Sequence, residues 1–135
     1  MSIKQVRLSN QAKEQLIRLK MRTGIPHWNV LCRWAFCLSI SDPTSPRALQ
    51  ERNVGAIEMT WKTFAGDDDE LYRILLIRRS AADLGKTDRE ALGKTIRQHI
   101  ARGTARLVAN RGLKSTRDLI ELALGADQTE AVDVA

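Results

Sequence analysis

The sequence has 135 residues, a length that suggests one domain with one hydrophobic core. Hydrophobic residues make up 43% of it and charged residues 28%, which is ordinary for a soluble globular protein. A formal net charge of +6 and a pI near 9.8 favour polyanionic partners, nucleic acid first and an acidic membrane surface second.

Several classes of protein are excluded. No apolar run approaches the roughly 20 residues that span a bilayer, and the start, MSIKQVRLS, lacks the apolar core of a signal peptide. We therefore expect a cytoplasmic protein with no membrane partner. Cys32 and Cys37 are the only cysteines, and the cytosol keeps thiols reduced, so we expect neither a disulfide nor a zinc site. Both thiols are interpreted as buried structural groups.

The positive charge is concentrated at the start of the chain. Residues 1–40 carry seven basic side chains and one acidic side chain, Glu14. Residues 41–80 carry six basic and seven acidic side chains, and residues 81–135 carry nine and eight. The net charge of the whole chain therefore equals that of its first forty residues, where we expect an anionic partner to bind.

A short strand is predicted to precede the first helix. Val6 and Leu8 alternate with Gln5 and Arg7, as in a strand with one buried and one exposed face. Ser9 is a suitable N-cap for a helix over about residues 10–23.

The first helix has an apolar stripe between two basic flanks. The stripe consists of Ala12, Leu16 and Leu19. At about 100° per residue, the stripe is flanked on one side by Lys13 and Lys20, and on the other side by Arg18 and Arg22.

A second helix is predicted from about Pro26 to Ser39, after Gly24 ends the first. Its only ionic residue is Arg33, and apolar side chains cover most of its circumference: Trp28, Val30, Leu31, Trp34, Ala35, Phe36 and Leu38. Such a helix needs burial on several sides. In so short a chain the simplest cover is a second copy, so we expect a homo-oligomer.

The rest of the chain is predicted to be mostly helical. Residues 56–64 alternate as a strand or an extended segment, residues 67–84 form a helix, and Thr87 and Glu90 form a capping box for a long helix over residues 88–110. One face of the long helix is apolar: Leu92, Ile96, Ile100, Gly103 and Leu107. A short helix over residues 115–124 completes a domain of residues 1–125, and the acidic tail, residues 126–135, is expected to be disordered.

A strand followed by two helices matches the plan of a ribbon-helix-helix dimer, in which one strand from each subunit pairs in the major groove. Gln5 and Arg7 would be exposed there, with Lys4 beside them, and these residue types can address bases or phosphates. A charged, solvated strand edge explains the same pattern. The predicted fold class is mainly α, with a ribbon-helix-helix-like N-terminal unit followed by further packed helices in one oligomeric domain.

Signals for catalysis are weak. The acidic run of residues 67–70 could suggest a magnesium site, but neighbours on a helix point about 100° apart, so four consecutive acids cannot converge on one ion. Favourable interaction with the helix dipole explains the run better. His27 and His99 are isolated in sequence, and no glycine-rich phosphate loop, HExxH or GxSxG motif occurs. We predict no catalytic residue, no metal site and no cofactor.

Three stretches carry a resemblance to a known family: RLSNQAKEQLIRLKMRTGIPHWNVLCRWAFCLSI (7–40), GAIEMTWKTFAGD (55–67) and ARGTARLVANRGL (101–113). Together they resemble DndE, the small component of the bacterial DNA sulfur modification (phosphorothioation) system. The similarity covers nearly the whole chain except the C-terminal tail. The stretches NVLCRWAFCLS and EMTWKTFAG are distinctive and not generic amphipathic patterns.

The resemblance implies a cytosolic homo-oligomer, expected to be a tetramer, with a helical fold related to ribbon-helix-helix proteins. It implies binding to double-stranded DNA, with nicked duplex favoured, alongside the desulfurase, sulfur-transfer and ATPase components of the modification complex. Those partners would carry the chemistry, which predicts a non-catalytic accessory subunit. From charge concentration and helix geometry, the predicted DNA-binding residues are Lys4, Arg7, Lys13, Arg18, Lys20 and Arg22.

Two other classes of function stay open. One is an enzyme of the same pathway, either a nickase that uses the acidic run or a sulfur-relay protein that uses Cys32 and Cys37. The other is a transcriptional repressor of the ribbon-helix-helix type.

Overall fold

The computed structural model describes residues 3–47 and 55–124. The N-terminal unit consists of β1 (Gln5–Leu8), α1 (Asn10–Thr23) and α2 (Trp28–Ile40). It is followed by β2 (Ile57–Thr60), α3 (Trp61–Ala65), the 3-10 helix η1 (Gly66–Asp68), α4 (Asp69–Leu84), α5 (Arg89–Ala109) and a helix over residues 116–124. The mainly helical fold class and the order strand, helix, helix are confirmed. The predicted disorder of residues 126–135 lies outside the described residues.

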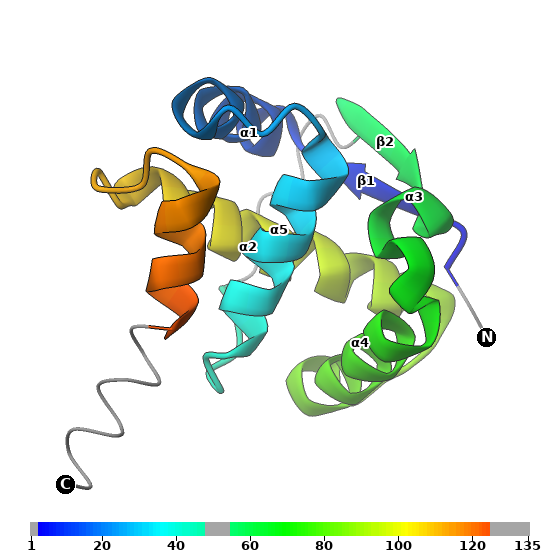
Figure 1. Cartoon of the computed structure of the whole chain (residues 1–135). Coiled ribbons are helices and arrows are strands. Elements are labelled where there is room, and N and C mark those ends of the chain that lie inside the picture. Colours follow the sequence, from blue (N-terminus) through cyan, green and yellow to red (C-terminus); the bar gives the residue numbers. More distant parts are fainter. Residues whose placement is uncertain (1–2, 48–54, 125–135) are drawn as a thin grey trace, which may run out of the picture.

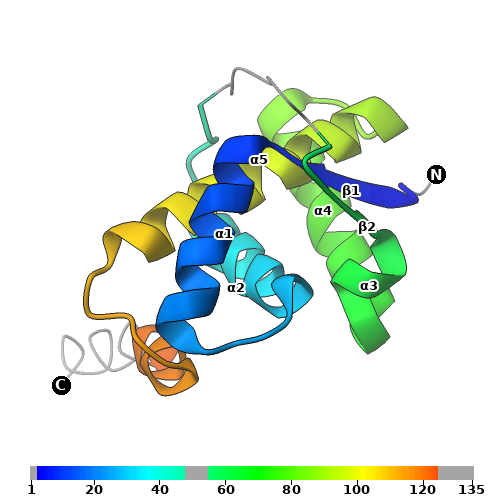
Figure 2. The same cartoon turned by 90° about the horizontal axis from the view of Figure 1, so that it is seen from above.

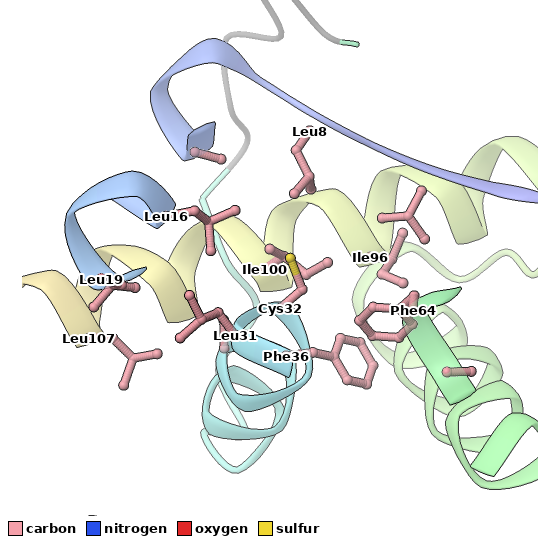
Figure 3. Packing of buried hydrophobic residues seen from close by; sticks show 14 of the residues in the cluster. Leu8, Leu16, Leu19, Leu31, Cys32, Phe36, Phe64, Ile96, Ile100 and Leu107 are labelled. Atoms are coloured by element: carbon pink, nitrogen blue, oxygen red, sulfur yellow. The ribbon is translucent and has the colours of Figure 1, made fainter. Parts of the chain in front are cut away.

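The long helix α5 runs through the middle of the molecule, with α1, α2 and α4 around it (Figures 1 and 2). The apolar face predicted for it is buried along its whole length. Figure 3 shows Leu16 and Leu31 pointing from α1 and α2 toward Ile100. The core therefore lies on both sides of α5, because an apolar stripe from each surrounding helix packs on it. None of the helices described is long and apolar enough to cross a membrane.

α2 and α5 come together at Gly103. A Cβ atom at this position would lie 1.9 Å from the backbone oxygen of Ala35. The two backbones can approach this closely only because residue 103 has no side chain. Gly103 thus allows α2 and α5 to pack closely.

α2 starts two residues later than predicted, at Trp28, and one side of it is completely buried within the chain: Leu31, Cys32, Ala35, Phe36 and Ser39. The apolar residues of the other side are half-buried against the core: Trp28, Val30, Trp34 and Leu38. The chain itself therefore covers much of the apolar circumference, and packing against a second copy stays a prediction.

The small sheet is formed within one chain. β1 pairs antiparallel with β2, and Arg7 lies opposite Glu58. The strand predicted over residues 56–64 ends earlier, at Thr60, because the Thr60 hydroxyl accepts a hydrogen bond from the Thr63 amide (3.1 Å) and caps α3. Trp61, which lies within the predicted strand, is buried as the first residue of that helix.

Both predicted ends of the first helix are confirmed. Ser9 caps α1 by accepting from the Ala12 amide at 3.2 Å, and Gly24 ends that helix in the left-handed conformation. The capping box predicted for α5 is wrong by one position. Asp88 is the N-cap, with its carboxylate accepting from the Ala91 amide at 2.8 Å, so the helix begins one residue later than a Thr87 cap requires.

Candidate nucleic-acid interface

The six predicted DNA-binding residues lie on β1 and α1 and do not form one surface. Lys4, Arg18 and Lys20 are exposed, and none of their side chains has a hydrogen-bond or ion-pair partner in the described part of the chain. The other three each have neighbours that limit their availability: Arg7, Lys13 and Arg22.

On the sheet, the exposed charge is partly neutralised. Arg7 Nε lies 2.7 Å from Glu58 Oε1, as the strand register requires. Both side chains remain about half exposed, at 57% and 49%. An ion pair this exposed is weak, so it does not lock Arg7, but it places a carboxylate beside any phosphate that approaches.

Lys13 lies near the same carboxylate. It is half-buried in a hollow that Glu58 also lines, between the start of α2 and β2. The flank of α1 that carries Lys13 therefore faces a neighbouring negative charge, which lowers its attraction for a polyanion.

Arg22 has a structural role. Its guanidinium donates to the backbone oxygens of Val108 (3.0 Å) and Asn110 (3.3 Å), at the C-terminal end of α5. Unpaired carbonyls and the negative end of the helix dipole gather there, so a cation is favourable. The half-buried Arg22 thus attaches α1 to α5.

The opposite flank of α1 leads into a basic cleft. Gln11 lies seven residues before Arg18, Gln15 lies seven residues before Arg22, and the two glutamines are four residues apart, so all four lie on one side of the helix. The Thr104 hydroxyl of α5 donates to Gln15 at 3.0 Å, which fixes this side of α1 against α5.

The cleft has a volume of about 440 Å³ and lies between the start of α1, residues 44–47 and α5. Four arginines line it, and no acidic residue is among its lining groups. Ser9, three glutamines, Thr44 and Ser45 supply further polar atoms, and the complete lining comprises Ser9, Gln11, Ala12, Gln15, Thr44, Ser45, Pro46, Arg47, Arg97, Gln98, Ala101, Arg102, Ala105 and Arg106. Figure 2 shows the segment of residues 41–47 on the side of α5 where α1 begins.

The wall formed by residues 42–45 is held by arginines of α4 and α5. Arg79 donates to the backbone oxygens of Thr44 (2.5 Å) and Asp42 (2.8 Å). Arg102 donates to the same backbone oxygen of Thr44 at 2.8 Å and to the backbone oxygen of Ser39 at 2.7 Å. Charged hydrogen bonds to several carbonyls fix a segment that has no secondary structure of its own.

Asp42, the first residue of this wall, provides a negative charge that pairs with Arg106. Its carboxylate accepts from the hydroxyl and the amide of Thr44 and from Arg106 Nη2 at 2.7 Å. These hydrogen bonds, in that order, hold the pKa of Asp42 below its usual value, so the carboxylate is ionised. Arg106 is still 45% exposed, so part of its guanidinium can meet a ligand in the cleft.

A buried polar chain lies beneath the cleft. Ser39 Oγ is 2.8 Å from His99 Nδ1, and His99 Nε2 is 2.7 Å from Asp83 Oδ2. Burial lowers the pKa of His99, and the hydrogen bond with Asp83 opposes this only in part, so the ring is neutral at pH 7. Burial raises the pKa of Asp83, but hydrogen bonds from His99, Ser45 and Arg79 outweigh it and leave the carboxylate ionised.

Asp83, His99 and Ser39 follow one another as the groups of a catalytic acid–base–nucleophile chain do, but here they support the fold. Ser39 and His99 are both 0% exposed, so no substrate can reach them. Ser39 Oγ also accepts a hydrogen bond from Arg102 Nε at 2.8 Å, which withdraws electron density from the oxygen. The chain links α2, α4 and α5 and satisfies polar groups that would otherwise be costly to bury. His99, isolated in the sequence, thus lies inside the core.

The two cysteines differ in environment, contrary to the prediction that both are buried. Cys32 is inside the core, and burial raises its pKa to about 12. Cys37 is exposed, with Sγ 3.9 Å from the Tyr72 hydroxyl, and partial burial of the thiol also raises its pKa. Neither thiol has the low pKa that activates a cysteine.

The acidic run contributes to folding. Asp69 accepts from the indole nitrogen of Trp61 and from Arg73 Nη2 at 3.0 Å. It starts α4, where a negative charge is favourable. Within residues 3–47 and 55–124, no group of three or more His, Cys, Asp or Glu side chains could hold a metal ion.

Sequence reasoning missed the arginines of the cleft. A charge count along the chain makes residues 81–135 nearly neutral, because eight acidic side chains, among them Asp88, Glu90, Asp118 and Glu121, offset nine basic ones. In the fold those acids are outside the cleft lining. Positions 97, 102 and 106 on a single predicted helix were the available signal, but the contribution of Arg47 required the tertiary structure.

Known proteins share the fold and the sequence pattern of this chain. The family model of the DNA sulphur modification protein DndE matches residues 5–115. The crystal structure of DndE from Escherichia coli B7A, involved in DNA phosphorothioation modification, is similar with a TM-score of 0.64 and 25% identity, over 79% of this chain and 99% of that chain. The structure of a DndE G21/24K mutant involved in DNA phosphorothioation has the same fold, with a TM-score of 0.62 and 22% identity over 81% of this chain and 100% of that chain. A comparison with curated proteins gives no match.

The family match covers far more than half of the residues, and it includes both the sheet and the helices that form the cleft. The resemblance found in the sequence is thereby confirmed. The chain belongs to the DndE family of DNA sulphur modification proteins.

Proposed function

We propose that this chain is a non-catalytic DNA-binding subunit of the phosphorothioation machinery, and that it acts in the cytoplasm with the sulfur-transfer and ATPase components. The proposal rests on the exposure of positively charged side chains in the N-terminal part of the chain. The side chains of Lys4, Arg18 and Lys20 are exposed and have no partner among the residues described, so their charge is available to a polyanion.

The flank of α1 that carries Arg18 is the better candidate for the DNA contact. It adjoins the arginine-lined cleft, whereas Lys13 on the other flank and Arg7 on the sheet lie near Glu58. Arg22 contributes by orienting this flank on α5. We therefore keep all six predicted residues in the proposal but expect Arg18 to matter more than Arg7, Lys13 or Arg22.

Contacts of this kind bind the phosphate backbone, which carries no sequence information. A base-reading ribbon is less favoured because Arg7 is paired with Glu58 on the exposed face of the sheet. Phosphate binding agrees with a preference for nicked duplex, whose flexible backbone can bend toward a curved basic surface. A homotetramer would bring several copies of this surface to one DNA molecule and raise the affinity through multivalency.

The non-catalytic part rests on the chemistry of the groups present. The Ser39–His99–Asp83 chain is inaccessible, and burial raises the pKa of both cysteine thiols, which makes them poor nucleophiles for sulfur relay. Asp69 of the acidic run is already bonded to Trp61 and Arg73.

The test is a DNA-binding titration with intact, nicked and single-stranded oligonucleotides of one sequence. The triple variant Lys4→Glu, Arg18→Glu, Lys20→Glu should bind each DNA far more weakly than the wild type. The matched control reverses three exposed cations elsewhere, Lys62, Lys86 and Arg89. Equal affinity of the triple variant and the wild type would refute the proposal, and equal affinity for intact and nicked duplex would remove the nick preference. Native mass spectrometry of the same samples tests the tetramer.

A further inference from the structure

The cleft between α1 and α5 has the properties of a site for one phosphate group and not of a general basic surface. It is concave and lined by Arg47, Arg97, Arg102 and Arg106, with glutamine and hydroxyl groups between them. Asp42 pairs with Arg106 (2.7 Å) and Arg102 (3.8 Å), and it belongs to the wall without being among the residues that line the cleft. Arg47, Arg102 and Arg106 against Asp42 thus leave two positive charges in excess in a confined space.

The groups of the cleft are held in place before any ligand binds. Arg102 is only 13% exposed and bonds Ser39 and Thr44 with all three of its nitrogens. It therefore acts as a fixed charge in the lining of the cleft and supports the wall. A preorganised cationic site loses little entropy when an anion binds.

Two arginines have donors to offer. Arg47 is exposed and has no hydrogen-bond or ion-pair partner within the described residues, and Arg106 bonds Asp42 through Nη2 alone. A guanidinium has five N–H donors, so both side chains can make new hydrogen bonds to phosphate oxygens. Arg97 is not counted among these donors.

We propose that this cleft binds a phosphate monoester of nucleotide size. A monoester carries a charge of about −1.5 to −2 at pH 7, which matches the excess of positive charge better than a backbone diester does. The volume of about 440 Å³ exceeds that of a phosphate group and lies in the range of small-molecule sites. The monoester belongs either to the end of a DNA strand or to a free nucleotide. The DNA-end version rests on the proposed function, and the free-nucleotide version does not.

The test has two arms that use the full chain. In the first, dAMP and deoxyadenosine are titrated by calorimetry, and in the second a nicked duplex with a 5′- or 3′-phosphate at the nick is compared with the same duplex carrying only hydroxyls. The wild type should prefer the phosphorylated ligand in at least one arm, and that arm identifies the source. The variant Arg47→Gln, Arg106→Gln should weaken this preference by about tenfold or more, because charged hydrogen bonds are lost.

The control variant is Arg89→Gln, Arg117→Gln, which removes the same charge from exposed positions outside the cleft. It should keep the phosphate preference. The single variant Arg47→Gln, which breaks no hydrogen bond or ion pair with a described residue, guards against misfolding of the double variant and should show a smaller loss. Absence of a phosphate preference in both arms, or an equal loss in the control, overturns the proposal. DNA binding that persists without a phosphate preference overturns only this inference and leaves the proposed function intact.

Discussion

The most direct stability prediction concerns Gly103, where α2 meets α5. In Gly103→Ala the new Cβ would lie 1.9 Å from the Ala35 oxygen and 2.4 Å from its carbonyl carbon. Real Cβ contacts are essentially never shorter than 3.0 Å, so the two helices must separate by about 1 Å. The atoms met belong to the backbone, so no change of rotamer relieves the clash.

The magnitude follows from two opposing effects. Overpacking of a core costs about 1–3 kcal/mol, and a backbone clash belongs at the upper end of that range. Alanine is favoured over glycine inside a helix by about 1 kcal/mol. We therefore expect a net loss of about 2 kcal/mol or more, which at roughly 4 °C per kcal/mol for a chain of this size lowers Tm by about 8 °C.

Gly93 of the same helix provides the matched control. A Cβ there meets only the movable end of the Arg97 side chain, at 3.3 Å, so Gly93→Ala should leave Tm unchanged or raise it. Thermal and urea unfolding followed by circular dichroism, at one protein concentration, would measure both variants. A Gly103→Ala protein as stable as the wild type would show that the helices do not cross at this position.

Three further predictions concern buried groups. Because burial holds the pKa of His99 below its ordinary value of 6.5, the unfolded chain binds the proton more readily, so stability is retained above pH 6.5 and lost as the pH falls below it. Replacing the exposed His27 by Gln leaves His99 as the remaining histidine, and Tm of this variant should fall between pH 7 and 5 as in the wild type; a pH-independent Tm would contradict the burial of His99. Cys37 should react with a maleimide in the native protein and Cys32 only after unfolding, and equal rates would refute the assignment of the core. Arg22→Gln should lower the urea midpoint by the equivalent of about 1–2 kcal/mol, through its lost carbonyl bonds, and a loss of DNA affinity without a loss of stability would show that it binds DNA instead.

Periodicity and capping residues account for the parts of the fold that the sequence predicted. The alternation of Val6 and Leu8 and the stripe of Leu16 and Leu19 place these side chains in the core because strand and helix geometry leave no other buried face. The cap at Ser9 was equally visible, since it depends only on neighbours in sequence. The β2 strand was predicted too long because the Thr60 cap, a local signal, was overlooked beside a continuing alternation.

Long-range contacts decide the remaining features. The partner of β1 is fifty residues away, and the Arg7–Glu58 pair follows from a register that no local pattern specifies. The arginine-lined cleft joins residue 47 to helix α5, and its wall depends on hydrogen bonds from Arg79 and Arg102 to backbone oxygens, which any residue type could supply. A charge count along the chain averages over faces, and therefore it located the basic flank of α1 but not the cleft.

The salt dependence of DNA binding tests the central claim most directly. Plotting log K against log salt concentration for a nicked duplex should give a steep negative slope, about −0.9 for each phosphate contacted. Arg18→Gln should weaken binding and make the slope shallower by about one unit, whereas Lys62→Gln, at an exposed position on α3, should leave it unchanged. A flat slope for the wild type, or identical slopes for Arg18→Gln and the wild type, would contradict phosphate binding by this flank of α1.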